Sequence, residues 1–258
     1  GPLTRTVEDA ALLLAASGEG PGGPLQLPQI NLPFELSLQQ VALPALQLDL
    51  YGSELSLSIP RLQANWSETR LHLPALSVRH PGLGSVQLDG EIEFAGDWPL
   101  RIAAALELEA QPPLAPLALR QAQLQAGGDL RELSLEVSAS GEQALQLQLQ
   151  VDALAEDLPF SLQAQADWQL PLSLQPLLPE LSAQSPLLLE SPLRLEANGT
   201  LQSQQFSLAA GAGGLGYTGV RATASGALSG GSLQLQDVSL EDAGGGGLTA
   251  SGLLLLGE

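Results

Sequence analysis

The sequence contains no cysteine, no methionine and no lysine among its 258 residues. Without cysteine the chain can form neither a disulfide framework nor a thiolate site, so its redox compartment stays open. All nine basic residues are arginines, and against 28 acidic residues they leave a formal net charge of −19. This charge repels nucleic-acid phosphates and anionic headgroups. Direct binding to nucleic acid is therefore disfavoured.

Long hydrophobic runs are also missing. The apolar run at residues 10–16 is much shorter than the roughly 20 residues of a membrane-spanning helix. It also follows two acidic residues, whereas a signal peptide places basic residues before its apolar run. Because there is no methionine and the leucine run at 253–256 stops in mid-pattern, we expect a fragment of a longer protein.

The first 24 residues differ in pattern from the rest. Residues 6–9 place a threonine three positions before an aspartate, as at a capped helix start, and apolar residues then recur at helical spacing. The stretch "GEGPGGP" at 18–24 is a flexible, turn-forming segment. The sequence predicts a short helix and a linker over residues 1–24, followed by one repeat sheet over 25–258.

From residue 25 onward, apolar residues occupy every second position. In "ALQLQLQV" (144–151), leucine or valine alternates with polar glutamine. This period is typical of a strand with one face buried and the other in water. Leucine and glutamine are mediocre strand formers, so the pattern rather than propensity carries the prediction. The residues that we expect to line one common apolar face are Leu55, Leu57, Ile59, Leu88, Ile92, Ile102, Leu106, Leu108, Leu133, Leu135, Leu145, Leu147, Leu149, Val151, Leu193, Leu195, Leu233 and Leu235.

The proline-rich stretch at 170–193 interrupts this alternation, because proline cannot donate to a strand ladder. We interpret it as a crossover or a short helix within the sheet. Polar-glycine pairs recur about every 26 residues toward the end of the chain, which indicates a repeated hairpin-like unit.

Acidic pairs such as Glu91/Glu93 fall on the polar side of their strands, as expected of a solvated face. If residues 95–99 form a hairpin loop, Glu93 and Arg101 lie opposite each other as a cross-strand pair.

The sequence offers little that resembles a reaction centre. Residues 211–216, "GAGGLG", match the dinucleotide motif GxGxxG, but the residues after them look extended and no βαβ unit surrounds them, so we interpret them as a plain loop. His72 and His80 have no carboxylate at a recognised metal spacing. We predict no catalytic residue, no metal site and no cofactor, and therefore no enzyme.

Residues 1–16, "GPLTRTVEDAALLLAA", resemble a segment of the amidase-signature hydrolases. Those enzymes use a Ser-Ser-Lys triad, and this chain has no lysine. The resemblance therefore assigns no catalytic role here, and we interpret the string as a shared amphipathic helix.

The apolar face needs a cover. Burying one leucine contributes roughly 1.5–3 kcal/mol, so a dozen left in water would forgo about 20–30 kcal/mol, beyond a domain's net stability of about 5–15 kcal/mol. The cover can be a second sheet, a wrap of the same sheet or an amphiphilic ligand. With three Trp, two Tyr and four Phe, the lining is mainly aliphatic, which suits acyl chains and equally an ordinary core.

Residues 90–141 and 157–174 resemble the amino-terminal half of a long periplasmic member of the AsmA-like family of bridge-like lipid-transfer proteins. Residues 27–66 and the proline-rich stretch resemble it too. The likeness rests on strand rhythm and on the Asp-Trp turns at 97–98 and 167–168. It implies an all-β fold, an elongated, curled antiparallel repeat sheet that forms a β-taco-like trough.

The same resemblance implies a function. The trough would shield phospholipid acyl chains during transfer between the inner and outer membranes, within an inner-membrane-anchored protein of the periplasm. The outer-membrane barrel partner, TamA, would meet parts of the full protein outside this fragment. The alternative is a scaffold or chaperone that assists outer-membrane protein assembly or secretion by strand augmentation.

Overall fold

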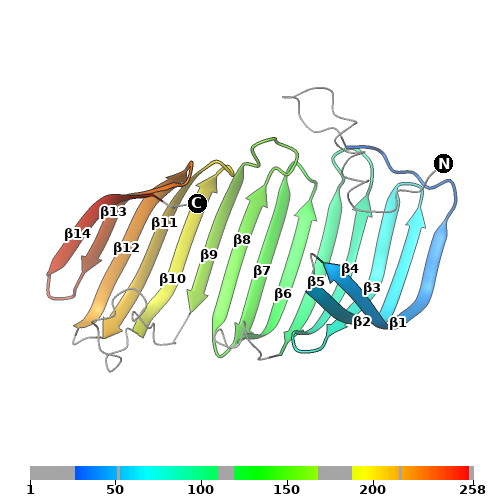
Figure 1. Cartoon of the computed structure of the whole chain (residues 1–258), viewed down its shortest axis with the longest axis horizontal. Coiled ribbons are helices and arrows are strands. Elements are labelled where there is room, and N and C mark those ends of the chain that lie inside the picture. The colour runs from blue at the N-terminus through cyan, green and yellow to red at the C-terminus, as the bar shows by residue number, and fades with distance from the viewer. Residues whose placement is uncertain (1–26, 51–52, 110–118, 168–187, 215–216, 256–258) are drawn as a thin grey trace. The chain divides into compact units, whose positions relative to one another are not determined.

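The computed structural model describes residues 27–50, 53–109, 119–167, 188–214 and 217–255. Within these ranges the chain forms strands and no helix, and hence no helix able to cross a bilayer (Figure 1). The strands are β1 (Leu36–Leu50), β2 (Ser53–Ser67), β3 (Arg70–His80), β4 (Gly84–Glu93), β5 (Leu100–Leu108), β6 (Leu119–Gly128), β7 (Leu133–Gly141), β8 (Ala144–Val151), β9 (Phe160–Asp167), β10 (Leu188–Gly199), β11 (Ser203–Gly214), β12 (Tyr217–Ser229), β13 (Ser232–Glu241) and β14 (Gly247–Leu255).

Each strand is hydrogen-bonded to the next one along the chain, so one 14-stranded sheet has the order β1 to β14. The pairings from β1 to β5 and from β9 to β14 are antiparallel. Antiparallel neighbours need only short turns, which fits the closely spaced strands of this sequence. The predicted all-β antiparallel class is confirmed.

Two sequence predictions concern residues outside the described ranges. The helix and linker expected over 1–24 lie outside them, as does most of the proline-rich stretch. The last part of that stretch, from Leu188 onward, belongs to strand β10.

The chain divides into two compact units. Unit 1 comprises Gly1–Glu109, Gln123–Leu135 and Gln150–Leu158, and contains β1 to β5. Unit 2 comprises Ala110–Ala122, Glu136–Leu149 and Pro159–Glu258, and contains β9 to β14.

Side-chain burial follows the sequence alternation. In β8 the residues Leu145, Leu147, Leu149 and Val151 are half-buried, and the intervening glutamines are exposed. Strands β7 and β9 alternate in the same way. Since successive strand residues point to opposite faces, each of these strands has an apolar and a polar side.

Candidate functional site

The register of unit 1 gathers apolar side chains on one face. Leu62 of β2 lies opposite Leu76 of β3, Leu76 opposite Leu88 of β4, and Leu88 opposite Ala104 of β5. Directly paired residues of antiparallel strands point to the same side of the sheet. A second row of the same face consists of Trp66, Leu71, Ile92 and Leu100. We call this side the apolar face of unit 1.

Irregularities of the backbone keep the apolar residues on that face. Where apolar residues are three positions apart instead of two, the later side chains would turn to the opposite side of a regular strand. A β-bulge absorbs the extra residue. The strand pairings shift register where apolar residues are three positions apart. Three of these shifts contain a proline, namely Pro44, Pro60 or Pro74, and proline has no amide hydrogen to donate to the neighbouring strand. The spacings of three are Leu38/Val41, Leu43/Leu46, Ile59/Leu62 and Leu73/Leu76.

Unit 2 has an apolar face of its own. Leu195 of β10 lies opposite Ala164 of β9 and Leu208 of β11. The row continues from Leu208 to Ala224 of β12, and from Ala224 to Val238 of β13. Two of the five residues in this row, Ala164 and Ala224, are alanines. The apolar face of unit 2 is therefore less uniformly leucine-lined than that of unit 1.

The residues predicted to line the apolar face lie in strands of both units, and that they line one lipid-binding groove stays a prediction. Leu55 lies in β2 opposite Leu48 of β1, and the other predicted residues are half-buried. The prediction named no residue of β1, β3, β6, β9, β11, β12 or β14, although Leu76 and Leu208 show the same alternation. The buried hydrophobic residues of the described ranges are Ala64, Leu119, Ala139, Leu154, Ala166 and Ala212. Most leucines of both faces thus keep part of their surface accessible, and the described residues do not seal them into a closed core.

Three aromatic residues end the apolar face of unit 1, and we call them the aromatic corner: Trp66, Phe94 and Trp98. The Trp66 and Phe94 rings stack with centroids 5.0 Å apart, and Trp98 meets Phe94 edge to face at 5.0 Å. The Trp98 indole N–H donates to the carbonyl oxygen of Pro28 at 3.2 Å. The sequence pattern predicted a turn at 97–98 and did not predict this cluster. Because the chain has few aromatic residues, the closely spaced Phe94 and Trp98 could have indicated it.

The turns beside the aromatic corner are tied to one another. The Leu130 N–H donates to the carbonyl oxygen of Asp97 at 2.8 Å, and the Ala153 N–H donates to that of Leu130 at 2.7 Å. The Arg131 Nε atom donates to the Asp97 carboxylate at 3.0 Å. This hydrogen bond, and next the charge of Asp97, raise the pKa of Arg131 above its ordinary value. The ties hold three successive turns of unit 1 at fixed spacing.

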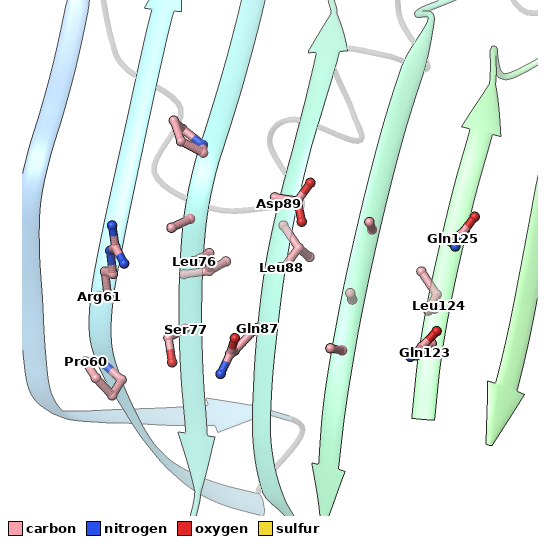
Figure 2. A pocket seen from close by; sticks show the side chains of 15 residues that line it. Pro60, Arg61, Leu76, Ser77, Gln87, Leu88, Asp89, Gln123, Leu124 and Gln125 are labelled. Carbon is pink, nitrogen blue, oxygen red and sulfur yellow. The ribbon is translucent and has the colours of Figure 1, made fainter. Parts of the chain in front are cut away.

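The polar side of the sheet carries open hollows. One in unit 1 has a volume of about 490 Å³ (Figure 2). Each contributing strand supplies residues two positions apart, such as Gln87 and Asp89 of β4, which places the hollow on the polar side. Ala103 and Ala105 occupy polar-side positions of β5 and leave this space open. A hollow of about 180 Å³ in unit 2 is lined by residues that include Gln146, Gln148, Gln163, Gln165, Arg194 and Glu196.

Glutamine amides make up half of the polar side chains that line the hollow in unit 1 and most of those in unit 2, and amides do not titrate in the physiological range. In the part of the chain that the structure describes, no three His, Asp or Glu residues gather as a metal-holding group.

The predicted pairing of Glu93 with Arg101 is wrong. Arg101 lies opposite Glu91, and Glu93 lies opposite Arg70, which forms ion pairs with Glu91 at 3.3 Å and Glu93 at 3.4 Å. The hairpin is displaced because the Phe94 N–H leaves the β5 side and donates to Thr69 at 2.7 Å.

The predicted loop at 211–216 is also wrong in its first part. Gly211–Gly214 continue strand β11, where Gly211 and Ala212 pair with β12. A Cβ atom on Gly213 would meet the Glu190 side chain, which would have to move aside. The residues that follow, from Tyr217, are extended as predicted.

Comparison with known proteins places this sheet in a family. No curated protein and no solved structure matches the chain. Residues 22–255 match the family described as TamB, N-terminal domain. The match includes every described strand, from β1 to the end of β14. The chain therefore belongs to the TamB family.

Proposed function

We propose that the apolar faces of this chain hold phospholipid acyl chains, and that the chain is a segment of a periplasmic bridge that shields them during transfer between the inner and outer membranes. One observation carries the proposal. Successive strands of each unit put half-buried aliphatic side chains on one face, and the described residues leave that face unsealed. Membership of the TamB family supports the same function.

The energetics favour a hydrocarbon occupant. A half-buried leucine still exposes apolar area, and covering it gains roughly 25 cal/mol per Å². An acyl chain gains about 0.8 kcal/mol for each methylene that it buries. An acyl chain satisfies such a face without polar partners, whereas a small polar ligand needs placed donors and acceptors.

The surrounding assembly is part of the same proposal. The chain would work in the periplasm, within a protein anchored in the inner membrane, and the outer-membrane barrel TamA would meet other regions of that protein. The proposed role is non-enzymatic and uses no cofactor.

Photo-crosslinking in cells tests this function. A photo-reactive residue at Leu106 or Leu147, on the apolar side, should trap phospholipid. Their matched controls are the adjacent polar-side residues Glu107 and Gln146, which are exposed. Equal lipid trapping from both members of each pair would contradict the proposal.

A second candidate function follows from strand β14, the last strand in the order formed by the described residues. Its sequence, GLTASGLLL, has no charge and no proline, and Leu248 and Leu253 are 63% and 67% exposed. A sheet edge with such a sequence can accept a further strand. This scaffold function predicts that proline at Thr249 or Ala250 impairs outer-membrane protein assembly more than Leu147→Arg does. The reverse order would favour the lipid-binding function.

A further inference from the structure

A short segment, residues 27–33, crosses the ends of strands in unit 1 before β1 begins (Figure 1). We call it the strap. The Ile30 N–H donates to the carbonyl oxygen of Phe94, and the Leu32 N–H to that of Glu68, both at 3.0 Å. With the bond from Trp98 to Pro28, these contacts fasten the strap to the aromatic corner and to the turn beside it.

The strap is apolar on one side. Leu27, Ile30 and Leu32 are half-buried, and the residues between them are exposed. The backbone bond from Ile30 to Phe94 and the bond from Trp98 to Pro28 place the strap backbone beside the aromatic corner. The strap therefore takes up space at the end of the apolar face of unit 1.

The strap is held less firmly than a strand. It has two prolines, Pro28 and Pro33, which cannot donate backbone hydrogen bonds. A paired strand such as β4 is bonded along its whole length on both sides. Segments with few backbone bonds and partly exposed side chains open locally before the sheet does.

We propose that the strap is a detachable cover of the aromatic corner, and that acyl chains reach this corner when the strap lifts. The inference rests on the proposed lipid-binding function and adds an entry point to it. Trp66 and Phe94 continue the rows of Leu71 and Ile92, so a lifted strap joins the aromatic corner to the aliphatic face. Tryptophan suits such an entry, because it combines an apolar ring with a polar edge.

Tryptophan quenching tests this inference. The chain has three tryptophans, so Trp168→Phe leaves those of the aromatic corner as reporters. The probe is a short-chain phosphatidylcholine with brominated acyl chains, kept below its micelle concentration. Ile30→Pro removes the donor to Phe94, and Asn31→Pro is the control, because no backbone bond of the Asn31 N–H occurs among the described residues. Circular dichroism and hydrogen exchange in β4 check that both variants keep the sheet.

The expected result is half-maximal quenching at an approximately two- to tenfold lower probe concentration in Ile30→Pro than in Asn31→Pro, as for one lost hydrogen bond in a closing equilibrium. The Leu32 amide should also exchange faster in Ile30→Pro. Equal quenching in the two variants, or an unchanged Leu32 amide, would overturn the inference.

Crosslinking at Leu147 separates this result from the proposed function. Lipid trapped at Leu147, with no difference in quenching, removes the strap as a cover and leaves the lipid-binding function intact. A difference in quenching without lipid at Leu147 supports the strap and contradicts transfer along the chain.

Discussion

Leu62 of β2 lies opposite Leu76 of β3, although each follows the previous leucine or isoleucine of its strand by three positions. Bulges next to Pro60 and Pro74 take up the extra residues. Both strands thereby keep a single apolar side through a break in sequence period. Without the bulges, a slip of one residue would move every later side chain of the strand to the opposite face of the sheet. The irregular backbone of unit 1 therefore keeps the leucines on one face.

Truncating Leu76 should destabilise the sheet moderately. Leu76→Ala removes contacts to Leu62 and Leu88, and because Leu76 is half-buried we expect a loss of about 1–3 kcal/mol, below the upper range for a fully buried leucine. Gln87→Ala, on the exposed side of β4, should stay within about 0.5 kcal/mol. Urea titration measures both, and equal losses would contradict a one-sided apolar face.

Two glycines in one row should respond oppositely to alanine. A Cβ atom on Gly226 would collide with the Gln234 carbonyl oxygen and lie 2.9 Å from the Phe206 ring, whereas one on Gly252 would meet nothing within 4 Å. We expect Gly226→Ala to cost about 1–3 kcal/mol by overpacking. Gly252→Ala should be neutral or stabilise by up to about 1 kcal/mol. Thermal unfolding of the two variants compares them, and a neutral Gly226→Ala would refute the close packing of β12.

The tie between Arg131 and Asp97 should depend on salt. Both side chains are partly exposed, so Arg131→Gln should lower the urea midpoint at low ionic strength and much less in high salt. The control is Arg120→Gln, which removes a longer, more exposed ion pair with Glu142 and should shift the midpoint less.

The pH dependence of that tie follows from the raised pKa of Arg131. A group whose pKa is raised by folding contributes its full stability below its unfolded pKa, and loses it as the pH rises through the folded value. Between about pH 5 and 9, well below the ordinary arginine pKa, Arg131 should therefore add no slope to the stability curve. A difference between wild type and Arg131→Gln that varies over this range would contradict this assignment.

A one-residue insertion in β8 should be worse than a two-residue insertion. One alanine after Leu147 moves Leu149 and Val151 to the polar side, because β8 alternates without interruption. We expect a loss of about 1–3 kcal/mol from their lost burial. Two alanines restore the period and should cost less. If both insertions destabilise equally, the alternation does not set the face of these residues.

Alternation predicted the strands and the face of residues such as Leu147 and Leu195, because period two is written directly in the sequence. The bulges were not predicted, although spacings of three next to Pro60 and Pro74 mark them. A spacing of three becomes a bulge only when the neighbouring strand pairs across it with a shifted register, and the sequence of one strand does not show that pairing.

Contacts between segments that are distant in the chain could not be predicted from the sequence. Phe94 leaves its hairpin to bond Thr69 and receives a bond from Ile30, which displaced the predicted Glu93 pairing. The aromatic corner and the strap depend on the same contacts. The hollow on the polar side was not predicted, because it depends on the small side chains of Ala103 and Ala105 lying opposite Asp89 and Gln87 of the neighbouring strand.

The proposed function depends most on an apolar face that accepts hydrocarbon, and spin labels along β8 test that face most directly. The chain has no native cysteine, so single cysteines at residues 145–150 can each carry one label. On adding phospholipid, labels at Leu145, Leu147 and Leu149 should gain collisions with dissolved oxygen and lose them with a water-soluble nickel complex. Labels at the three intervening glutamines should stay unchanged. Uniform behaviour along the strand, or a lipid response confined to the glutamines, would contradict the account.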